Sequence, residues 1–329
     1  MMDRRQTLAA LGSVVAAAAA SSAQAQGRVP PARGTAPDPT EVIELWPGGA
    51  PGAPPTLPVE RIEERSKTTA LSDRAITGTR RPRLVVFRPK APNGSALLVA
   101  PGGGYVRVVL DKEGFEIGRW LAERGWTVFV LFYRLPGDGW AAGPDTPLQD
   151  SQRAMRLIRS HAQSYGIRSD RVAAMGFSAG GHVCGDLATR YDARVYAPVD
   201  AADKLSARPD IVAPIYPVQS MRLPVAHGGS RTQLLGVDPT PALEAAHSPD
   251  SNVRATTPPC FLVHAEDDAT VPVENSLALR AALKRAGVPV ETHLFTEGGH
   301  GFGIRGAAGK PAAIWPDLFA RWAKTHGLG

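Results

Sequence analysis

One serine in the chain stands in a pattern that could make it a nucleophile. In the run Gly176-Phe177-Ser178-Ala179-Gly180 the serine lies between glycines at positions i−2 and i+2, as a sharp turn from a strand into a helix requires. The glycines let neighbouring backbone approach such a turn without a clash against a Cβ atom. With 34 glycines in 329 residues, the pattern can also arise by chance. The functional interpretation therefore depends on the residues that could assist Ser178.

A base for Ser178 can be chosen among the histidines that follow it. A serine hydroxyl needs a base that takes its proton and a third group that orients this base. His300 lies between glycines in a loop after the strand-like run 290–295, and we predict that it is the base. His264 and His293 fall inside strand patterns, where a packed or hydrogen-bonded histidine is expected instead.

The orienting acid is chosen from a cluster that follows the predicted buried strand 260–264. Glu266, Asp267 and Asp268 stand together there. Asp268 lies where the loop should turn back, so we predict that it fixes the tautomer of His300 and stabilises its cation. Asp267 and Glu266 are expected to cap the loop or to be solvated.

A glycine run upstream of the serine could supply the other groups that acyl transfer needs. The oxyanion of the tetrahedral intermediate is usually held by preorganised backbone N–H groups. The N–H of Ala179, directly after the serine, is one expected donor. The strand-like run 96–100 is followed by Pro101 and three glycines, so Gly103 and Gly104 are the other predicted donors. A phosphate cradle is the alternative, but the run lacks the spacing of the phosphate-binding and dinucleotide-binding loops.

Strand-like and helix-like segments alternate along most of the chain. Predicted strands cover 84–89, 95–100, 126–133, 171–176, 209–216, 260–264 and 290–295, and predicted helices cover 112–124, 147–164, 179–190, 273–286 and 312–325. This alternation predicts an α/β fold, with a mostly parallel central sheet and helices on both faces. The length and a hydrophobic content of 43% are sufficient for one large domain, and the chain shows no internal repeat.

Six motifs together give the chain a family resemblance. In order, they are Pro101-Gly102-Gly103-Gly104-Tyr105, Tyr133-Arg134-Leu135-Pro136, Pro147-Leu148-Gln149-Asp150, Gly176-Phe177-Ser178-Ala179-Gly180-Gly181-His182, Asp268-Ala269-Thr270-Val271-Pro272 and Gly299-His300-Gly301-Phe302. Over residues 40–325 the chain resembles an α/β-hydrolase of the esterase/lipase group, and within it bacterial carbohydrate esterases of the acetylxylan and feruloyl esterase type. Pro101 stands where lipase-like esterases place a histidine before their glycines, which favours the sugar-esterase branch.

The resemblance implies an α/β-hydrolase fold with a small cap insertion. It also implies a serine carboxylic-ester hydrolase that works through an acyl-enzyme, with no cofactor and no metal. The expected substrate is acetylated xylan or another acylated carbohydrate, and a general short-chain acyl ester is the alternative. Beside this site, Arg134 and Asp150 are expected to form a structural ion pair, and His182 is expected to cap or pack on its helix.

The parts that would contact the substrate are less well marked in the sequence. Segment 221–259 is irregular in pattern, and we treat it as a candidate substrate cap or, alternatively, as a surface excursion without ligand contact. Tyr105 and Trp140 are the candidate substrate-binding residues, because an aromatic ring offers a flat face on which a sugar can stack. For Trp140 a purely packing role is the alternative.

Other functional classes fit the chain less well. A serine peptidase of the prolyl-oligopeptidase kind shares the Ser, Asp, His order but would be expected to carry a large propeller domain as well. A non-catalytic binding module of the same fold would be expected to have lost one of these three residues, and none is missing. A metal-dependent hydrolase that uses His264, Glu266, Asp267 and Asp268 lacks an HExxH motif or a second histidine at helical spacing.

The N-terminal region is predicted to be a processing signal followed by an arm. Residues 1–25 contain a twin arginine, an apolar run and a small-residue cleavage site, which is typical of a twin-arginine signal peptide. The apolar run is shorter than the roughly 20 residues that span a bilayer, so we expect export to the periplasm or beyond without stable membrane insertion. Residues 26–58 are predicted to form a Pro/Gly-rich arm anchored by Trp46, and residues 59–329 the hydrolase domain.

Charge and cysteine content narrow the expected partners. The formal net charge of +6 has no clustered basic patch that would indicate nucleic-acid binding. The expected partner is therefore a small-molecule or oligosaccharide ester, and no pattern in the chain indicates an oligomeric state. Cys184 falls on a predicted helix and Cys260 opens a predicted strand, so two buried free thiols are expected rather than a disulfide.

Overall fold

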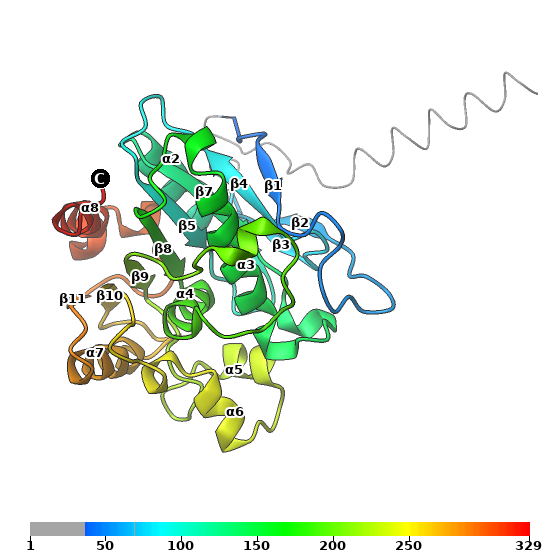
Figure 1. Cartoon of the computed structure of the whole chain (residues 1–329). Helices are drawn as coiled ribbons and strands as arrows, with labels where there is room; N and C mark the ends of the chain where they lie inside the picture. Colours follow the sequence, from blue (N-terminus) through cyan, green and yellow to red (C-terminus); the bar gives the residue numbers. More distant parts are fainter. Residues whose placement is uncertain (1–36, 69) are drawn as a thin grey trace, which may run out of the picture.

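An eight-stranded sheet forms the centre of the computed structural model, which describes residues 37–68 and 70–329 (Figure 1). Its strands are β1 (Val42–Glu44), β4 (Arg83–Phe87), β5 (Ala96–Ala100), β7 (Thr127–Phe132), β8 (Val172–Phe177), β9 (Val212–Ile215), β10 (Cys260–Ala265) and β11 (Val290–Phe295). They lie in the order β1-β4-β7-β5-β8-β9-β10-β11. The pairs from β7 to β11 are parallel, and only β1–β4 and β4–β7 are antiparallel in this sheet. The mostly parallel sheet predicted from the sequence is confirmed, whereas the predicted signal peptide lies outside the described residues.

Helices cover both faces of this sheet. They are α2 (Glu116–Ala122), which follows a π-helical turn, α3 (Thr146–Ser160), α4 (Ala179–Arg190), α7 (Glu274–Arg285) and α8 (Trp315–Thr325). Successive side chains of an extended chain point to opposite faces, so Trp126, directly before β7, and Phe129, within it, face opposite ways. Phe129 contacts Tyr165, shortly after α3, whereas Trp126 contacts Phe319 of α8. Helix α8 therefore covers one face, and α3, which packs beside α4, covers the other.

The N-terminal part contributes strands that the sequence did not indicate. Strand β1 lies within the segment 26–58 that was expected to be an arm, and it pairs with β4. A second, antiparallel sheet consists of β2 (Arg61–Glu64), β3 (Arg74–Thr77) and β6 (Val108–Val109). These strands have two to four residues, which is too short for an alternating pattern to be recognised. Trp46 is buried and its Nε1 donates to Asp150 Oδ1 at 2.7 Å, which confirms its expected anchoring role.

The candidate cap, residues 221–259, is more regular than predicted. It contains the short helices α5 (Gly228–Leu235) and α6 (Pro241–Ala246), which Figure 1 shows side by side at the edge of the molecule. Each helix is capped by a side chain: His227 accepts from the backbone N of Ser230, and Thr240 accepts from the backbone N of Leu243. Helices this short lack a repeating apolar pattern, so only their capping residues could have indicated them in the sequence.

Three further expectations concern buried and apolar features. Arg134 and Asp150 form the predicted ion pair at 2.8 Å, with both side chains fully buried. Cys184 and Cys260 are buried free thiols, which confirms the prediction. No helix in residues 37–68 and 70–329 is long and apolar enough to cross a membrane.

Candidate active site

Ser178 stands on a strained turn between β8 and α4. Its backbone has φ 53° and ψ −119°, a region that non-glycine residues rarely adopt. A Cβ atom on Gly176 would lie 2.0 Å from the carbonyl oxygen of Gly180, and one on Gly180 would lie 2.0 Å from that of Ala100. Both glycines are therefore required by close backbone contacts. The turn raises Ser178 from the end of the strand while its backbone N–H stays bonded to Ile215 O at 3.1 Å.

His300 links the serine to an acid. Its Nε2 lies 2.8 Å from Ser178 Oγ, and its Nδ1 lies 2.7 Å from Asp268 Oδ2. The His300 side chain keeps 19% of its surface exposed, whereas the Asp268 carboxylate is fully buried. Because the carboxylate accepts from Nδ1–H, Nε2 is left with a lone pair toward the serine hydroxyl. The structure thus brings the three predicted residues together in a line that can move a proton away from Ser178.

Asp268 is held by several donors at once. Its Oδ1 accepts from the backbone N of Thr270 and of Val271, both at 2.9 Å. Its Oδ2 accepts from His300 and also from His264 Nε2, at 3.2 Å. Burial alone would raise the pKa of Asp268, but the hydrogen bonds from His264 and His300 outweigh it and hold that pKa well below its usual range. The carboxylate therefore stays ionised at neutral pH.

The other histidine and acid near this loop have supporting positions. His264 lies in β10, as expected for a hydrogen-bonded strand residue, and its Nδ1 is 2.8 Å from Ser276 Oγ. Asp267 Oδ1 accepts from the backbone N of Gly298 and Gly299 at 2.9 and 2.7 Å. Asp267 thus fixes the loop that carries His300, whereas Asp268 contacts the imidazole itself.

The glycine loop after β5 borders the serine. The N–H of Gly102 is used, because it donates to Glu113 Oε2 at 2.9 Å. Within the described part of the chain, the N–H groups of Gly103 and Gly104 have no hydrogen-bond acceptor. Ala179 is the first residue of α4, so its N–H has no acceptor inside the helix. These three N–H groups are available to a bound molecule, as the sequence predicted for oxyanion donors.

A buried relay connects the glycine loop with the His300 loop. Glu113, whose Oε2 accepts from Gly102, accepts through Oε1 from the hydroxyl of Tyr216 at 3.0 Å. The same hydroxyl accepts from the backbone N of Gly303 at 3.0 Å. Tyr216 is fully buried, has φ 35°, and packs its ring edge-on against His300 with centroids 5.2 Å apart. No motif in the sequence marked Glu113 or Tyr216.

Tyr105 has a structural position rather than the predicted one at the substrate. Its side chain is 1% exposed, and its hydroxyl lies 2.6 Å from His182 Nδ1. His182 Nε2 lies 2.7 Å from the carbonyl of His247, which can only accept, so Nδ1 must accept from the Tyr105 hydroxyl. Burial lowers the pKa of His182 to about 4, consistent with this neutral ring. The prediction that Tyr105 stacks on a sugar is therefore wrong, because the ring anchors the glycine loop on α4.

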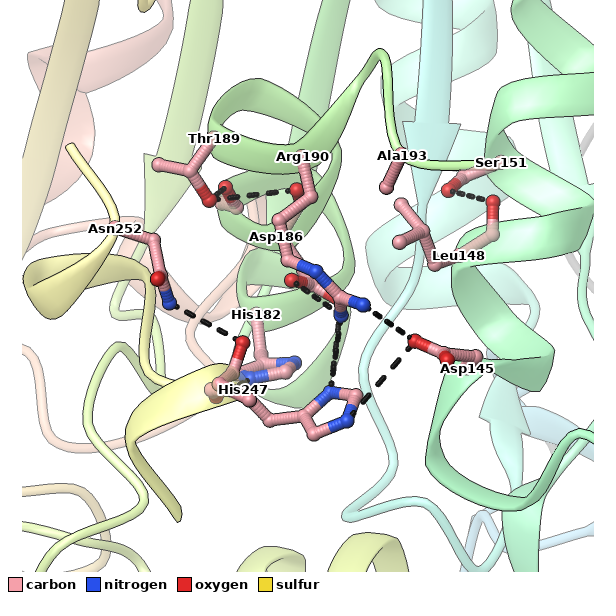
Figure 2. A network of polar contacts seen from close by, with 12 residues as sticks. Asp145, Leu148, Ser151, His182, Asp186, Thr189, Arg190, Ala193, His247 and Asn252 are labelled. Atoms are coloured by element: carbon pink, nitrogen blue, oxygen red, sulfur yellow. Dashed lines mark hydrogen bonds and ion pairs between the residues drawn. The ribbon is translucent and has the colours of Figure 1, made fainter. Parts of the chain in front are cut away.

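Polar contacts around His182 and Arg190 join α4 to the candidate cap (Figure 2). Arg190, at the end of α4, donates to Asp186 within the helix and to Asp145 Oδ1 at 2.7 Å. Arg190 Nη1 also lies 3.2 Å from His247 Nδ1. Since His182 bonds the backbone of His247, two residues of α4 hold this point of the cap. The helix that begins at the serine thus positions both the glycine loop and the cap.

Trp140 is also unavailable to a substrate. Its side chain is 3% exposed, and the Arg134 guanidinium lies 4.7 Å from the centroid of its ring. The prediction that Trp140 stacks on a sugar is wrong, and the packing alternative is correct. From the sequence alone, an aromatic residue in a glycine-rich loop cannot be distinguished from one that covers a buried arginine.

A pocket of about 220 Å³ opens over the serine. It is lined by Arg65, Gly103, Gly104, Val109, Lys112, Glu113, Ser178, His227, Thr270, His300 and Gly301. His227 belongs to the cap segment, so this segment borders the pocket, and its contact with a substrate stays a prediction. Arg65, Lys112 and His227 were not predicted, because isolated polar residues in loops carry no pattern that assigns them to a site.

Comparison with known proteins identifies a matching family and several similar proteins. It matches the BD-FAE family over residues 86–283. Endo-1,4-beta-xylanase B of Butyrivibrio fibrisolvens is 38% identical over 208 residues, which are 63% of this chain and 32% of that protein. Acetylxylan esterase of Xylanibacter ruminicola is 34% identical over 227 residues, which are 68% of this chain and 44% of that protein. The chain thus spans less than half the length of these two curated relatives.

Solved structures agree with this relationship. The acetyl ester-xyloside bifunctional hydrolase from Caldicellulosiruptor lactoaceticus is 33% identical with a TM-score of 0.71, and the match covers 92% of this chain and 100% of that one. A thermophilic esterase from Thermogutta terrifontis is 23% identical with a TM-score of 0.62, over 83% of this chain and 96% of that one. The second likeness concerns the fold alone, and together the two confirm the α/β-hydrolase fold.

Proposed function

The chain belongs to the BD-FAE family of α/β-hydrolase esterases, and from this premise we propose that it hydrolyses acetyl esters of xylan-type carbohydrates through an acyl-enzyme. The observation that carries the proposal is the contact series from Ser178 Oγ to His300 and on to Asp268, at 2.8 and 2.7 Å. These are hydrogen-bond distances for a nucleophile, its base and the group that orients the base. Ser178 and His300, the first two members of the series, line the pocket.

In the proposed reaction, His300 Nε2 takes the proton of Ser178 as its Oγ attacks the ester carbonyl. The imidazolium that forms is stabilised by the Asp268 carboxylate, which stays ionised. His300 then gives the proton to the leaving alcohol, and the acyl group remains on Ser178. A water molecule, deprotonated by His300, releases the acid and restores the serine.

The negative charge on the carbonyl oxygen is proposed to be held by Gly103, Gly104 and Ala179. Support comes from the free N–H groups of the two glycines and from the position of Ala179 at the start of α4. Donors held by the fold need no reorganisation when the charge develops, and removal of one such donor costs about 10²- to 10³-fold in kcat in serine hydrolases. The relay through Glu113 would keep the glycine loop in place.

The choice of substrate rests on relatives and on pocket size. Both a xylanase and an acetylxylan esterase are among the relatives, and a structural neighbour is described as an acetyl ester-xyloside hydrolase. A pocket of about 220 Å³ suits a short acyl group better than a long chain. The related ethyl acetate hydrolase of Pseudomonas putida supports the alternative of a general short-chain esterase.

The proposal is tested by turnover of a substrate panel. The panel compares acetylated xylo-oligosaccharides, methyl ferulate and nitrophenyl esters of increasing acyl length, at matched concentrations. We expect acetyl esters to be cleaved fastest and the sugar acetates to have the highest kcat/KM. A preference for long acyl chains would contradict the proposal, and equal kcat/KM for sugar and simple acetates would favour the general esterase.

We also propose that the protein is exported, on the strength of the twin-arginine pattern in residues 1–25. Polymeric xylan lies outside the cell, so export would bring the enzyme to its substrate. N-terminal sequencing of the protein from periplasm and medium should find a chain that begins near residue 26. Recovery of the protein from cytosol with an intact N-terminus would contradict export.

A further inference from the structure

His227 is a pocket residue without a role in the proposed reaction. It comes from the cap segment, directly before α5, and lines the pocket together with Ser178 and His300. Its Nδ1 lies 3.2 Å from the backbone N of Ser230 and 2.8 Å from Ser230 Oγ. One side of the imidazole is thus fixed against α5, while the ring remains partly exposed.

The contact with Ser230 decides which nitrogen of His227 carries the proton. A backbone N–H can only donate, so Nδ1 must present a lone pair to it. A neutral imidazole with an unprotonated Nδ1 has its proton on Nε2. In the imidazolium form, an Nδ1–H would point at the N–H of Ser230, which is unfavourable. Burial, and after it the proximity of His300, lowers the pKa of His227, in agreement with a neutral ring.

Among the residues that the structure describes, the Nε2–H of His227 has no acceptor. No hydrogen bond or ion pair within residues 37–68 and 70–329 uses this atom, although both partners of Nδ1 are present. The charged Arg65 of the same pocket differs in this respect, because it is paired with Asp73 at 2.8 Å. The imidazole of His227 is neutral and its tautomer is fixed, so it offers one N–H donor near the nucleophile. Such a donor suits an uncharged oxygen acceptor, such as a hydroxyl or ether oxygen.

We propose that His227 Nε2–H donates a hydrogen bond to a hydroxyl or ring oxygen of the sugar that carries the ester. His227 would then be a specificity-determining residue that selects polyhydroxylated alcohols over simple ones. This inference rests on the proposed function, because the ester attacked by Ser178 must extend toward the cap segment. It gives the cap segment a task in recognising the alcohol part of the substrate.

The first test uses His227→Asn. Asparagine is a favoured helix cap whose Oδ1 can accept from Ser230 N, but its side chain is too short to replace Nε2–H. The measured quantity is kcat/KM for acetylated xylo-oligosaccharides divided by kcat/KM for 4-nitrophenyl acetate, whose leaving group has no hydroxyl substituent. We expect this ratio to fall about threefold to tenfold, mainly through KM, as for one neutral hydrogen bond.

Thr240→Ala is the matched control, because it removes the corresponding cap of α6. Thr240 does not line the pocket, so the ratio should stay at the wild-type value even if the cap segment loosens. A ratio that falls equally in both variants would overturn the inference. An unchanged ratio in His227→Asn would also overturn it.

The second test observes the imidazole directly. Nitrogen NMR of Ser178→Ala protein distinguishes the Nε2–H tautomer from the Nδ1–H tautomer. We expect the Nε2–H form at neutral pH and a shift of its signal when acetylated xylo-oligosaccharide is added. An Nδ1–H form, or a signal that does not move at saturating ligand, would contradict the role of His227. Failure of the wild-type enzyme to cleave any sugar acetate would instead contradict the proposed function.

Discussion

Removal of one hydroxyl, by Tyr216→Phe, should weaken both the fold and the proposed reaction. This hydroxyl donates to Glu113 Oε1 and accepts from Gly303 N, each at 3.0 Å. Through Glu113 it reaches Gly102 of the glycine loop, and through Gly303 it reaches the loop of His300. Phenylalanine keeps the ring, which packs on Phe302 with centroids 4.6 Å apart, so only the polar contacts are lost.

The size of the effect follows from what remains buried. The variant leaves the N–H of Gly303 without its acceptor and takes one donor from the Glu113 carboxylate, which is 3% exposed. A buried polar group that loses its partner costs about 1–3 kcal/mol. We therefore expect the free energy of unfolding to fall by about 2–4 kcal/mol. A tenfold lower kcat, or about 1.4 kcal/mol of transition-state stabilisation, should accompany it because two loops of the site lose their connection.

Urea unfolding and turnover of 4-nitrophenyl acetate measure the two effects. Tyr165→Phe is the control, because it also removes a hydroxyl, which donates to Glu41 Oε1 at 2.8 Å, but Tyr165 does not line the pocket. The control should lose about 1 kcal/mol and keep its kcat. If the free energy of unfolding of Tyr216→Phe lies within about 0.5 kcal/mol of the wild-type value, the proposed cost of unpaired buried groups is refuted. A wild-type kcat would show that the relay does not position the two loops.

Three other results are expected. Asp268→Asn should lower kcat by about three to four orders of magnitude. Asp267→Asn keeps an acceptor for the His300 loop, so its kcat should fall much less. A larger loss of kcat in Asp267→Asn would mean that the acid is wrongly assigned. Because the pKa of Asp268 is lowered in the folded state, its carboxylate stabilises the fold at any pH above its pKa in the unfolded state, about 3.9. This contribution is lost as the pH falls toward the folded-state pKa. Acid unfolding curves should therefore be steeper for wild type than for Asp268→Asn. A thiol reagent should modify neither cysteine in the folded protein and both cysteines after denaturation. The reason is that burial shields both thiols and raises the pKa of Cys260 to about 12 and that of Cys184 further. Rapid labelling of the native protein would contradict their burial.

The sequence predicts the parts of this molecule that repeat a recognisable pattern. Strand runs such as 260–264 and 290–295 are long, apolar or alternating, and they reappear as β10 and β11. Ser178 could be proposed because its glycine neighbours are what a sharp strand-to-helix turn requires, and Asp268 and His300 because they stand in loops after later strands, in the order known for hydrolases of this kind. Close backbone contacts at Gly176 and Gly180 leave no room for a side chain, so the pattern itself carries structural information.

The rest depends on contacts between residues distant in sequence. Tyr105 looked like a sugar platform, but its place is decided by His182, which lies 77 positions away. Trp140 is covered in the fold because it packs on Arg134. His227 gave no sequence signal, since only the folding of the cap segment brings it into the pocket of Ser178. Aromatic and polar residues in loops can therefore be assigned only once their partners are known.

The central claim, that Ser178 is a nucleophile activated by His300, is tested most directly by covalent labelling with an activated phosphonate ester. Mass spectrometry of the digested protein should find one label per chain, on the peptide that contains Ser178. Labelling should be absent in Ser178→Ala and strongly slowed in His300→Ala, and Ser178→Ala should not turn over 4-nitrophenyl acetate. A label on another residue, or retained turnover in Ser178→Ala, would contradict the account.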